Sequence, residues 1–211
     1  MRKFCIILCF FTLFCVKASL GQTIIYSCNG KYKIELPSKV ELQESELNNV
    51  KRSGTAGSIT ISTNSGKIVF QQRGLNSDQK AAYQKYCRII IEYYKEDRNN
   101  SLYGCGDQIV VDRDLLYVVH SSVKEACRIN NTPLLKFLTI QPLDINGFPV
   151  LFYSYRRKGW EGKPAVVVNV YQIFNRYESV TLTFSYREAE REKWKDIHSN
   201  IVKTFKFIRK Y

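Results

Sequence analysis

Between Leu134 and Arg187 the chain carries four long apolar segments that are separated only by short turns. The segments read "LLKFLTIQPL", "PVLFYSYRR", "PAVVVNVYQIF" and "SVTLTFSYR". Asn146-Gly147 joins the first two, and this dipeptide is typical of a tight β-hairpin. In the last segment apolar and polar residues alternate, which predicts a half-buried strand with one polar face. The region therefore predicts an antiparallel β-meander.

The first half of the chain adds shorter elements. Alternation in "KYKIEL" predicts a strand that stops at Pro37, and the polar stretch 41–57 predicts a loop with a turn of helix at most. "SITIS" and "KIVFQQR" flank "TNSG", which predicts a second hairpin. "SDQKAAYQK" predicts a short helix. "YCRIIIEYY" predicts a strand whose Cys87, Ile89, Ile91 and Tyr93 point towards the core.

Two longer helices complete the pattern. The first begins after Asp112, whose carboxylate is suited to accept the free amide hydrogens of the first turn. Its apolar positions recur at helical spacing and are Leu115, Leu116, Val119, Val123 and Ala126. The second begins near Glu188, with a buried stripe of Trp194, Ile197, Ile201 and Phe205. Antiparallel strands with helices that do not strictly alternate predict an α+β domain whose helices pack on the sheet.

The amino terminus predicts a signal peptide. Arg2 and Lys3 precede an apolar run from Phe4 to Val16, which is short for a bilayer span, and Ser19 and Gly21 supply small residues at the cleavage positions. We expect residues 1–21 to be removed, and residues 22–211 to form a single soluble domain without a transmembrane span. The alternative is an N-terminal membrane anchor. If residues 1–21 are removed, the expected location is the periplasm or the extracellular medium.

The positive charge of the chain limits the classes of partner that we expect it to bind. Removal of the signal lowers the formal net charge from +13 to +10. A basic exported protein is attracted to anionic envelope components, glycans or acidic proteins. Nucleic acid is the usual partner of such a charge, but export argues against it. A basic surface that serves only solubility is the alternative.

The four cysteines that follow the signal predict two disulfides, since disulfides form outside the cytosol. If the helix from Asp112 packs back across the sheet, its Cys127 returns towards Cys87, and Cys105 is left for Cys28. We therefore predict Cys87–Cys127 and Cys28–Cys105. No Cys/His spacing of a metal site occurs, and neither a metal nor a cofactor is expected.

The turn in "YSYRRKGWEGKPAVVV" is the main candidate for a contact surface. It holds four cations, one carboxylate and a tryptophan between two strands. We expect a basic hairpin tip at residues 156–163 whose binding residues are Arg156, Arg157, Lys158, Trp160 and Lys163. The alternative is a solvated turn. Tyr153 and Tyr155 lie on one face of the adjoining strand, where packing under a helix is favoured over glycan binding.

A family resemblance joins these features. The stretch "GFPVLFYSYRRKGWEGKPAVVVNVYQIFNRYESVTLTFSYREAEREKWKDIHSNIVKTFKF", together with "YKIELPS", resembles the PsbP-like superfamily. The resemblance implies an α/β/α sandwich around an antiparallel sheet. Characterised members of this superfamily are non-catalytic binding or assembly modules, and others are secreted bacterial proteins of unknown role. No site residue is carried over, because none of theirs has a match here.

Three functions follow as hypotheses. The first is an exported, non-catalytic binding or accessory module that binds an unidentified protein or ligand. The second is a binder of anionic envelope surfaces through the tip at 156–163. The third is an enzyme with a site near Cys105, with His120 as its base. His198 is expected at the surface, and Asp112-Arg113-Asp114 is expected to cap a helix and not to bind a metal.

Overall fold

The structure is a computed structural model that describes residues 23–28, 30–55, 58–63, 66–78, 80, 84–95, 109–176 and 178–208. The strands are β1 (Thr23–Cys28), β2 (Tyr32–Leu36), β3 (Val40–Leu42), β4 (Lys51–Thr55), β5 (Ser58–Thr63), β6 (Lys67–Gln72), β7 (Cys87–Lys95), β8 (Leu134–Ile145), β9 (Phe148–Arg157), β10 (Val166–Asn175), β11 (Glu178–Arg187) and β12 (Lys206–Phe207). The helices are α1 (Arg113–Ile129) and α2 (Arg191–Lys203), with single 3₁₀ segments η1 (Glu44–Asn49), η3 (Trp160–Gly162) and η4 (Glu188–Glu190).

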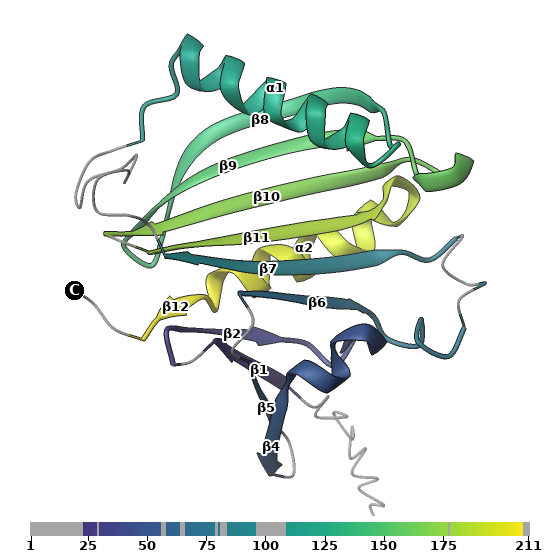
Figure 1. The fold of residues 1–211 in the computed structure, drawn as a ribbon, viewed down its shortest axis with the longest axis vertical. Coiled ribbons are helices and arrows are strands. Elements are labelled where there is room, and N and C mark those ends of the chain that lie inside the picture. The colour runs from purple at the N-terminus through teal and green to yellow at the C-terminus, as the bar shows by residue number, and fades with distance from the viewer. Residues whose placement is uncertain are drawn as a thin grey trace, which may run out of the picture.

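The predicted meander forms most of a seven-stranded antiparallel sheet. Its strand order is β3-β6-β7-β11-β10-β9-β8 (Figure 1). Asn146 and Gly147 both have positive φ, at 57° and 81°, as the tight turn between β8 and β9 requires. The prediction of an α+β domain built on an antiparallel sheet is confirmed, while the α/β/α sandwich stays a prediction.

A second sheet corrects two predictions about the first half of the chain. Its order is β12-β2-β1-β5-β4, and β1 and β5 pair in parallel. The predicted hairpin of "SITIS" and "KIVFQQR" is wrong, because β5 belongs to this sheet and β6 to the larger one. The stretch 41–57 has the turn of helix that was allowed for, η1, but it also contains β4 where a loop was predicted. Both errors have one cause: a local turn signal does not show that the chain is crossing between two sheets.

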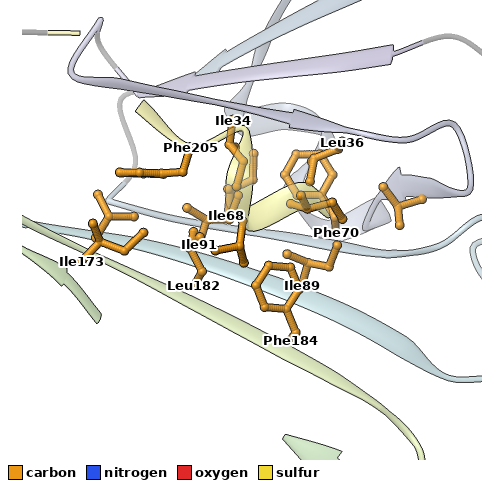
Figure 2. Packing of buried hydrophobic residues seen from close by; sticks show 14 of the residues in the cluster. Ile34, Leu36, Ile68, Phe70, Ile89, Ile91, Ile173, Leu182, Phe184 and Phe205 are labelled. Atoms are coloured by element: carbon orange, nitrogen blue, oxygen red, sulfur yellow. The ribbon is translucent and has the colours of Figure 1, made fainter. Parts of the chain in front are cut away.

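The main core lies between the two sheets and α2. Side chains from β2, β6, β7 and β11 meet there, and Figure 2 shows Ile68, Ile89, Leu182 and Phe184 in contact range. The carboxyl end of the chain closes this core, because Phe205 is fully buried and β12 pairs with β2. Burial of apolar side chains contributes roughly 25 cal/mol per Å² removed from water, so this cluster dominates the stability of the fold.

Helix α1 covers the opposite face of the large sheet, over β8 and β9. Its buried side chains are Val119, Val123 and Cys127. Leu116 and Ala126, which are among the apolar positions of this helix, are exposed, because the helix is rotated so that Val119, Val123 and Cys127 face the sheet. None of the helices in the described ranges is long and apolar enough to cross a membrane.

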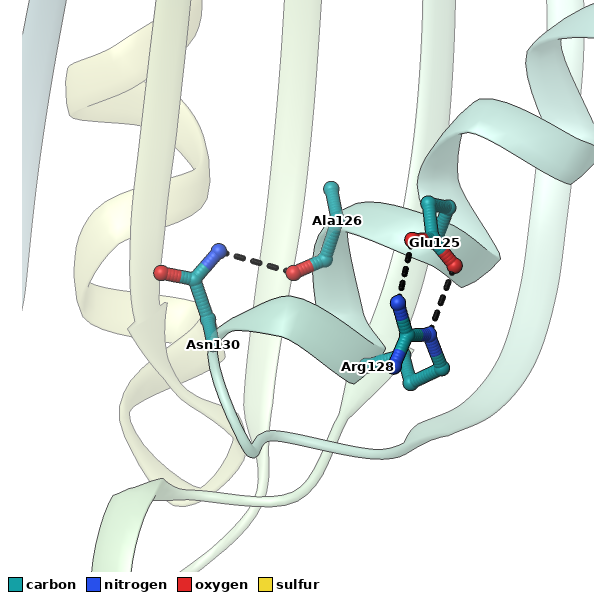
Figure 3. A network of polar contacts seen from close by, with 4 residues as sticks. All are labelled: Glu125, Ala126, Arg128 and Asn130. Atoms are coloured by element: carbon teal, nitrogen blue, oxygen red, sulfur yellow. Dashed lines mark hydrogen bonds and ion pairs between the residues drawn. The ribbon is translucent and has the colours of Figure 1, made fainter.

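Both ends of α1 are capped by side chains. The Asp112 carboxylate accepts a hydrogen bond from the Leu115 amide at 2.8 Å, so Asp112 caps the helix as predicted. At the other end the Asn130 side chain donates to the Ala126 carbonyl at 2.7 Å (Figure 3). In the same last turns Arg128 forms a two-pronged ion pair with Glu125. Because the pair is exposed, we expect it to add little stability.

His198 is in the core, which corrects its predicted surface position. It is 1% exposed and is surrounded by the rings of Phe184, Tyr186 and Trp194. Its Nε2 lies 3.3 Å from the Cys87 sulfur. Burial lowers the pKa of His198 to about 3, so the ring is neutral at physiological pH. The sequence prediction failed because the neighbours of His198 on the chain are polar and mask its inward direction.

We predict that Phe184→Ala lowers the free energy of unfolding by about 3–5 kcal/mol, since Phe184 is completely buried and its removal leaves a cavity. Urea unfolding followed by circular dichroism measures this loss. Leu135→Ala is the control, because Leu135 is 43% exposed, and we expect a change within about 0.5 kcal/mol. Similar losses for the two variants would contradict the position of the core.

We predict that His198 makes stability fall with acidity. Its pKa is depressed in the folded chain and is about 6.5 when unfolded, so below pH ~6.5 the unfolded state takes up the extra proton. This contribution is complete above pH ~6.5 and declines by about 1.4 kcal/mol per pH unit towards pH ~3. Unfolding free energies measured against pH should decline more gently in His198→Gln than in the native chain. His120→Gln, which alters an exposed histidine, should keep the native slope.

Candidate functional site

A pocket of about 800 Å³ lies on the α1 side of the large sheet, at the end nearest the β9–β10 connection. Strands β7, β11, β10 and β9 form its floor, and the last turn of α1 forms one wall. The β3–η1 junction and the η3 turn supply further lining residues. The pocket therefore draws on segments from residue 43 to residue 187, and no single stretch of sequence encodes it.

The strand register arranges the floor in rows that cross the sheet. The outermost row pairs Arg187 with Val166 and Val166 with Arg157. Neighbouring strands are about 4.8 Å apart, so the two arginine backbones lie roughly 10 Å from each other with a valine between them. The next row inwards runs from Arg88 through Ser185 and Val168 to Tyr155. The floor therefore has an apolar centre with cations at its outer end.

The pocket is strongly positive. Arg88, Arg157, Lys163 and Arg187 line it, whereas Glu44 is the single carboxylate that the described residues contribute to its lining. Within the described part of the chain, Arg88, Arg157 and Lys163 have no carboxylate partner. Four cations around one concave surface reinforce one another, because the protein walls screen charge less than water does.

Tyr86 organises two of these cations. The guanidinium carbon of Arg187 lies 5.0 Å from the centre of its ring, and that of Arg88 lies 6.0 Å away. The Tyr86 hydroxyl is 3.3 Å from the Ser185 hydroxyl, and its amide donates to Glu190 at 3.0 Å. Arg187 also donates to the Pro164 carbonyl at 2.8 Å. These contacts hold the arginine head groups in place before any ligand arrives.

The predicted basic tip is divided between two environments. Arg157, Trp160 and Lys163 line the pocket, with the Lys163 ammonium 5.0 Å from the centre of the Trp160 indole. Arg156 points to the other face of the sheet and forms an ion pair with Glu188 at 2.8 Å. Lys158 is exposed and lies outside the pocket lining. Alternation along β9 causes this separation, since successive side chains point to opposite faces.

Gly159 allows the tip to close. A Cβ atom at this position would lie 2.4 Å from the Lys163 carbonyl oxygen and 2.5 Å from that of Pro164. Backbone atoms cannot yield to such a contact, so any larger residue would open the turn. The turn also holds Glu161 at a φ of 50°, a conformation that few side-chain-bearing residues adopt. Trp160 and Lys163 are positioned by this tight backbone.

Tyr153 and Tyr155 pack beneath α1, as the sequence favoured. Both contact the buried valines of β10, and burial raises the pKa of Tyr153 to about 12 and that of Tyr155 still further. Both phenols therefore stay protonated at physiological pH. Tyr155 also lines the pocket, so it serves the core and the candidate site together.

The arrangement of Cys87 and His198 superficially resembles a nucleophile and its base. Burial raises the pKa of the Cys87 thiol and lowers that of His198, so both partners stay neutral. A catalytic pair needs a thiolate that substrate can reach. Cys87 has no exposed surface, which makes this pair part of the core. Cys105, the other proposed nucleophile, lies outside the described residues.

The predicted Cys87–Cys127 disulfide is wrong. Both thiols are free and buried, and they belong to different clusters. Cys87 faces α2 and Cys127 lies in α1, so the large sheet separates the two sulfurs. The helix does return towards the start of β7, but on the opposite face. The Cys28–Cys105 disulfide stays a prediction, because Cys105 and the Cys28 side chain lie outside the described part.

A metal site is not apparent in the ranges that the structure covers, where no three residues among His, Cys, Asp and Glu gather as ligands. The candidate site therefore consists of arginine, lysine, aromatic and small polar side chains. Such groups bind and orient anions, and arginine in particular pairs with planar oxyanions.

Comparison with solved structures identifies similar folds. PsbP of the cyanobacterium Synechocystis sp. PCC 6803 aligns with a TM-score of 0.50 and 15% identity, over 85% of this chain and 88% of that one. A Bacteroides thetaiotaomicron protein aligns at 0.48 and 12%, over 90% of this chain and 49% of that one. A Pseudomonas aeruginosa protein of unknown function aligns at 0.43 and 9%, over 74% and 95%. No protein-family model and no curated protein sequence matches.

We predict that Cys87 and Cys127 resist alkylation in the native protein and react once it is unfolded, because they are 0% and 2% exposed. Iodoacetamide labelling without reductant, followed by peptide mass spectrometry, measures this protection. A peptide that joins Cys87 to Cys127 would contradict the separation of the two thiols by the sheet.

Proposed function

We propose that this domain, whose fold is PsbP-like, is an exported non-catalytic binding module and that its ligand occupies the basic pocket. The observation that supports this proposal is the pocket of about 800 Å³, to which the part of the chain that the structure describes contributes four cations and one carboxylate. Pockets of roughly 300–1,000 Å³ are typical of small-molecule sites. The signal-like amino terminus supports export, and it lies outside the described residues.

A binding role fits the chemistry of the lining better than catalysis does. Cys87 and Cys127 are the thiols in the described lining, and burial raises the pKa of both, which disfavours the reactive thiolate. Arg88, Arg157 and Lys163 supply positive charge but no general base. The fold agrees with this proposal only in outline, because folds do not determine function.

Binding to an anionic envelope surface is the second candidate. Trp160 is 53% exposed beside Lys163, and an exposed tryptophan next to cations is typical of residues at a lipid interface. Each nearby lysine or arginine contributes about 1 kcal/mol of attraction to anionic headgroups. This candidate uses the outer surface of the tip, whereas the first uses the interior of the pocket.

We predict that Ala126→Trp abolishes ligand retention. Ala126 is exposed on α1 and lines the pocket, so an indole at this position fills the entrance without disturbing the core. Residues 22–211 are dialysed against a small-molecule extract of the source cells, and the retained compounds are identified by mass spectrometry. Ala189→Trp adds the same group at an exposed position outside the pocket lining and should retain them.

The outcomes separate the two candidates. A native chain that retains no compound would overturn the pocket as a binding site. Sedimentation with vesicles of anionic lipid tests the second candidate on the same proteins. Salt-sensitive binding that survives Ala126→Trp and is lost in Lys158→Gln would favour the envelope surface instead.

A further inference from the structure

We propose that the pocket binds a small organic anion whose oxyanion group lies at the cationic end, formed by Arg88, Arg157, Lys163 and Arg187, and whose apolar body lies along the valine floor. The inference rests on the proposed function, since it takes the pocket as the binding site and specifies the chemical class of its ligand. A carboxylate, a sulfonate or a phosphate provides the required oxygens.

The excess of positive charge in the pocket is the first reason to expect an anionic ligand. Among the described lining residues Glu44 is the single carboxylate, so the four cations there outnumber the negative charges inside one concave space. Arg88 and Arg187 both lie against the Tyr86 ring, which keeps two like charges close together. Like charges held in this way repel each other, and an anion placed between them removes the repulsion.

The side chain of Arg88 is the second reason, because it indicates where the oxyanion group binds. Its Nε is buried and donates to no partner among the described residues, although a buried charged group normally has hydrogen bonds. The Arg88 backbone neighbours Ser185 across the strands, and the Ser185 hydroxyl lies on the same face of the sheet. An oxyanion at this point gains the Arg88 guanidinium as a charged donor, beside the Ser185 hydroxyl, which donates to the Arg88 carbonyl at 3.4 Å.

The apolar floor of the pocket is the third reason, because it indicates that the rest of the ligand is apolar. Val166 and Val168 form its centre and Tyr155 its edge, with Ile90 and Thr183 one row further from the cations. Successive residues on one face of a strand are about 6.7 Å apart, so the surface changes from cationic to apolar within one or two rows. A free inorganic ion would leave most of this space unfilled, whereas an anion with an apolar or aromatic body fills both parts.

The experiment compares two probes that share one body. 8-Anilino-1-naphthalenesulfonate has a sulfonate, N-phenyl-1-naphthylamine lacks it, and both fluoresce in apolar surroundings. We expect the native chain (residues 22–211) to bind the sulfonate at least about tenfold more tightly, as one charge-assisted contact predicts. Ala126→Trp should prevent the binding of both probes.

Two variants locate the oxyanion. Arg88→Gln and Arg157→Gln should each weaken the sulfonate about tenfold and leave the neutral probe unchanged. Lys158→Gln is the matched control, because it removes one positive charge from the same tip but lies outside the pocket lining. Circular dichroism establishes that each variant is folded, and Arg157→Gln provides the test if Arg88→Gln does not fold.

The remaining results overturn the inference. Equal affinities for the two probes would mean that the cationic end does not bind the charged group. An equal effect of Lys158→Gln and Arg157→Gln would mean that general surface charge attracts the probe. In either case retention of a neutral compound from the cell extract would leave the proposed function standing. Competition by benzoate and by inorganic phosphate then identifies which oxyanion fits, and failure of both to displace the sulfonate would also count against the site.

Discussion

Strand β11 has buried side chains on both of its faces, and the need to cover its apolar face shapes the rest of the fold. Val180, Leu182, Phe184 and Tyr186 point to the core beneath α2, while Ser179 and Ser185 are buried on the other side. The apolar face of this strand needs a covering layer, because exposed apolar surface is costly in water. Helix α2 and the small sheet cover one face. On the other face α1 covers only β8 and β9, and the uncovered part of the floor becomes the pocket.

Local signals in the sequence predicted local structure well. The Asn146-Gly147 turn, the Asp112 cap and the alternation along β7 and β11 each depend on neighbouring residues, and the structure has each of them. The hairpin predicted between β5 and β6 failed because pairing of β5 with β1 is decided by contacts between distant segments. The same limit explains the disulfide: residue spacing placed Cys87 and Cys127 at one end of the sheet, but only three-dimensional packing places them on opposite faces.

The residues of the candidate site were also predicted only in part from the sequence. The charge of the tip was visible in the sequence, and three of the five predicted residues, Arg157, Trp160 and Lys163, line the pocket. Arg88 and Arg187 were missed because each lies in a strand, where an isolated cation is ordinarily a solvated residue. One available signal was their position in inward-facing rows: a cation that alternates into a covered face of a sheet either has a partner or lines a cavity.

The pairing of β12 with β2 joins an early and a late segment of the described residues. Phe207 lies opposite Tyr32, the Ile208 amide donates to the Lys31 carbonyl at 2.8 Å, and Thr204 bonds to the Glu35 backbone. During synthesis or translocation, residues 31–35 emerge early and residues 204–208 emerge late. The small sheet therefore cannot be completed until residues 206–208 emerge, and contacts of such long range slow folding. Until then the edge of β2 that pairs with β12 has no partner strand, and the main core lacks the side chains of Phe205 and Phe207.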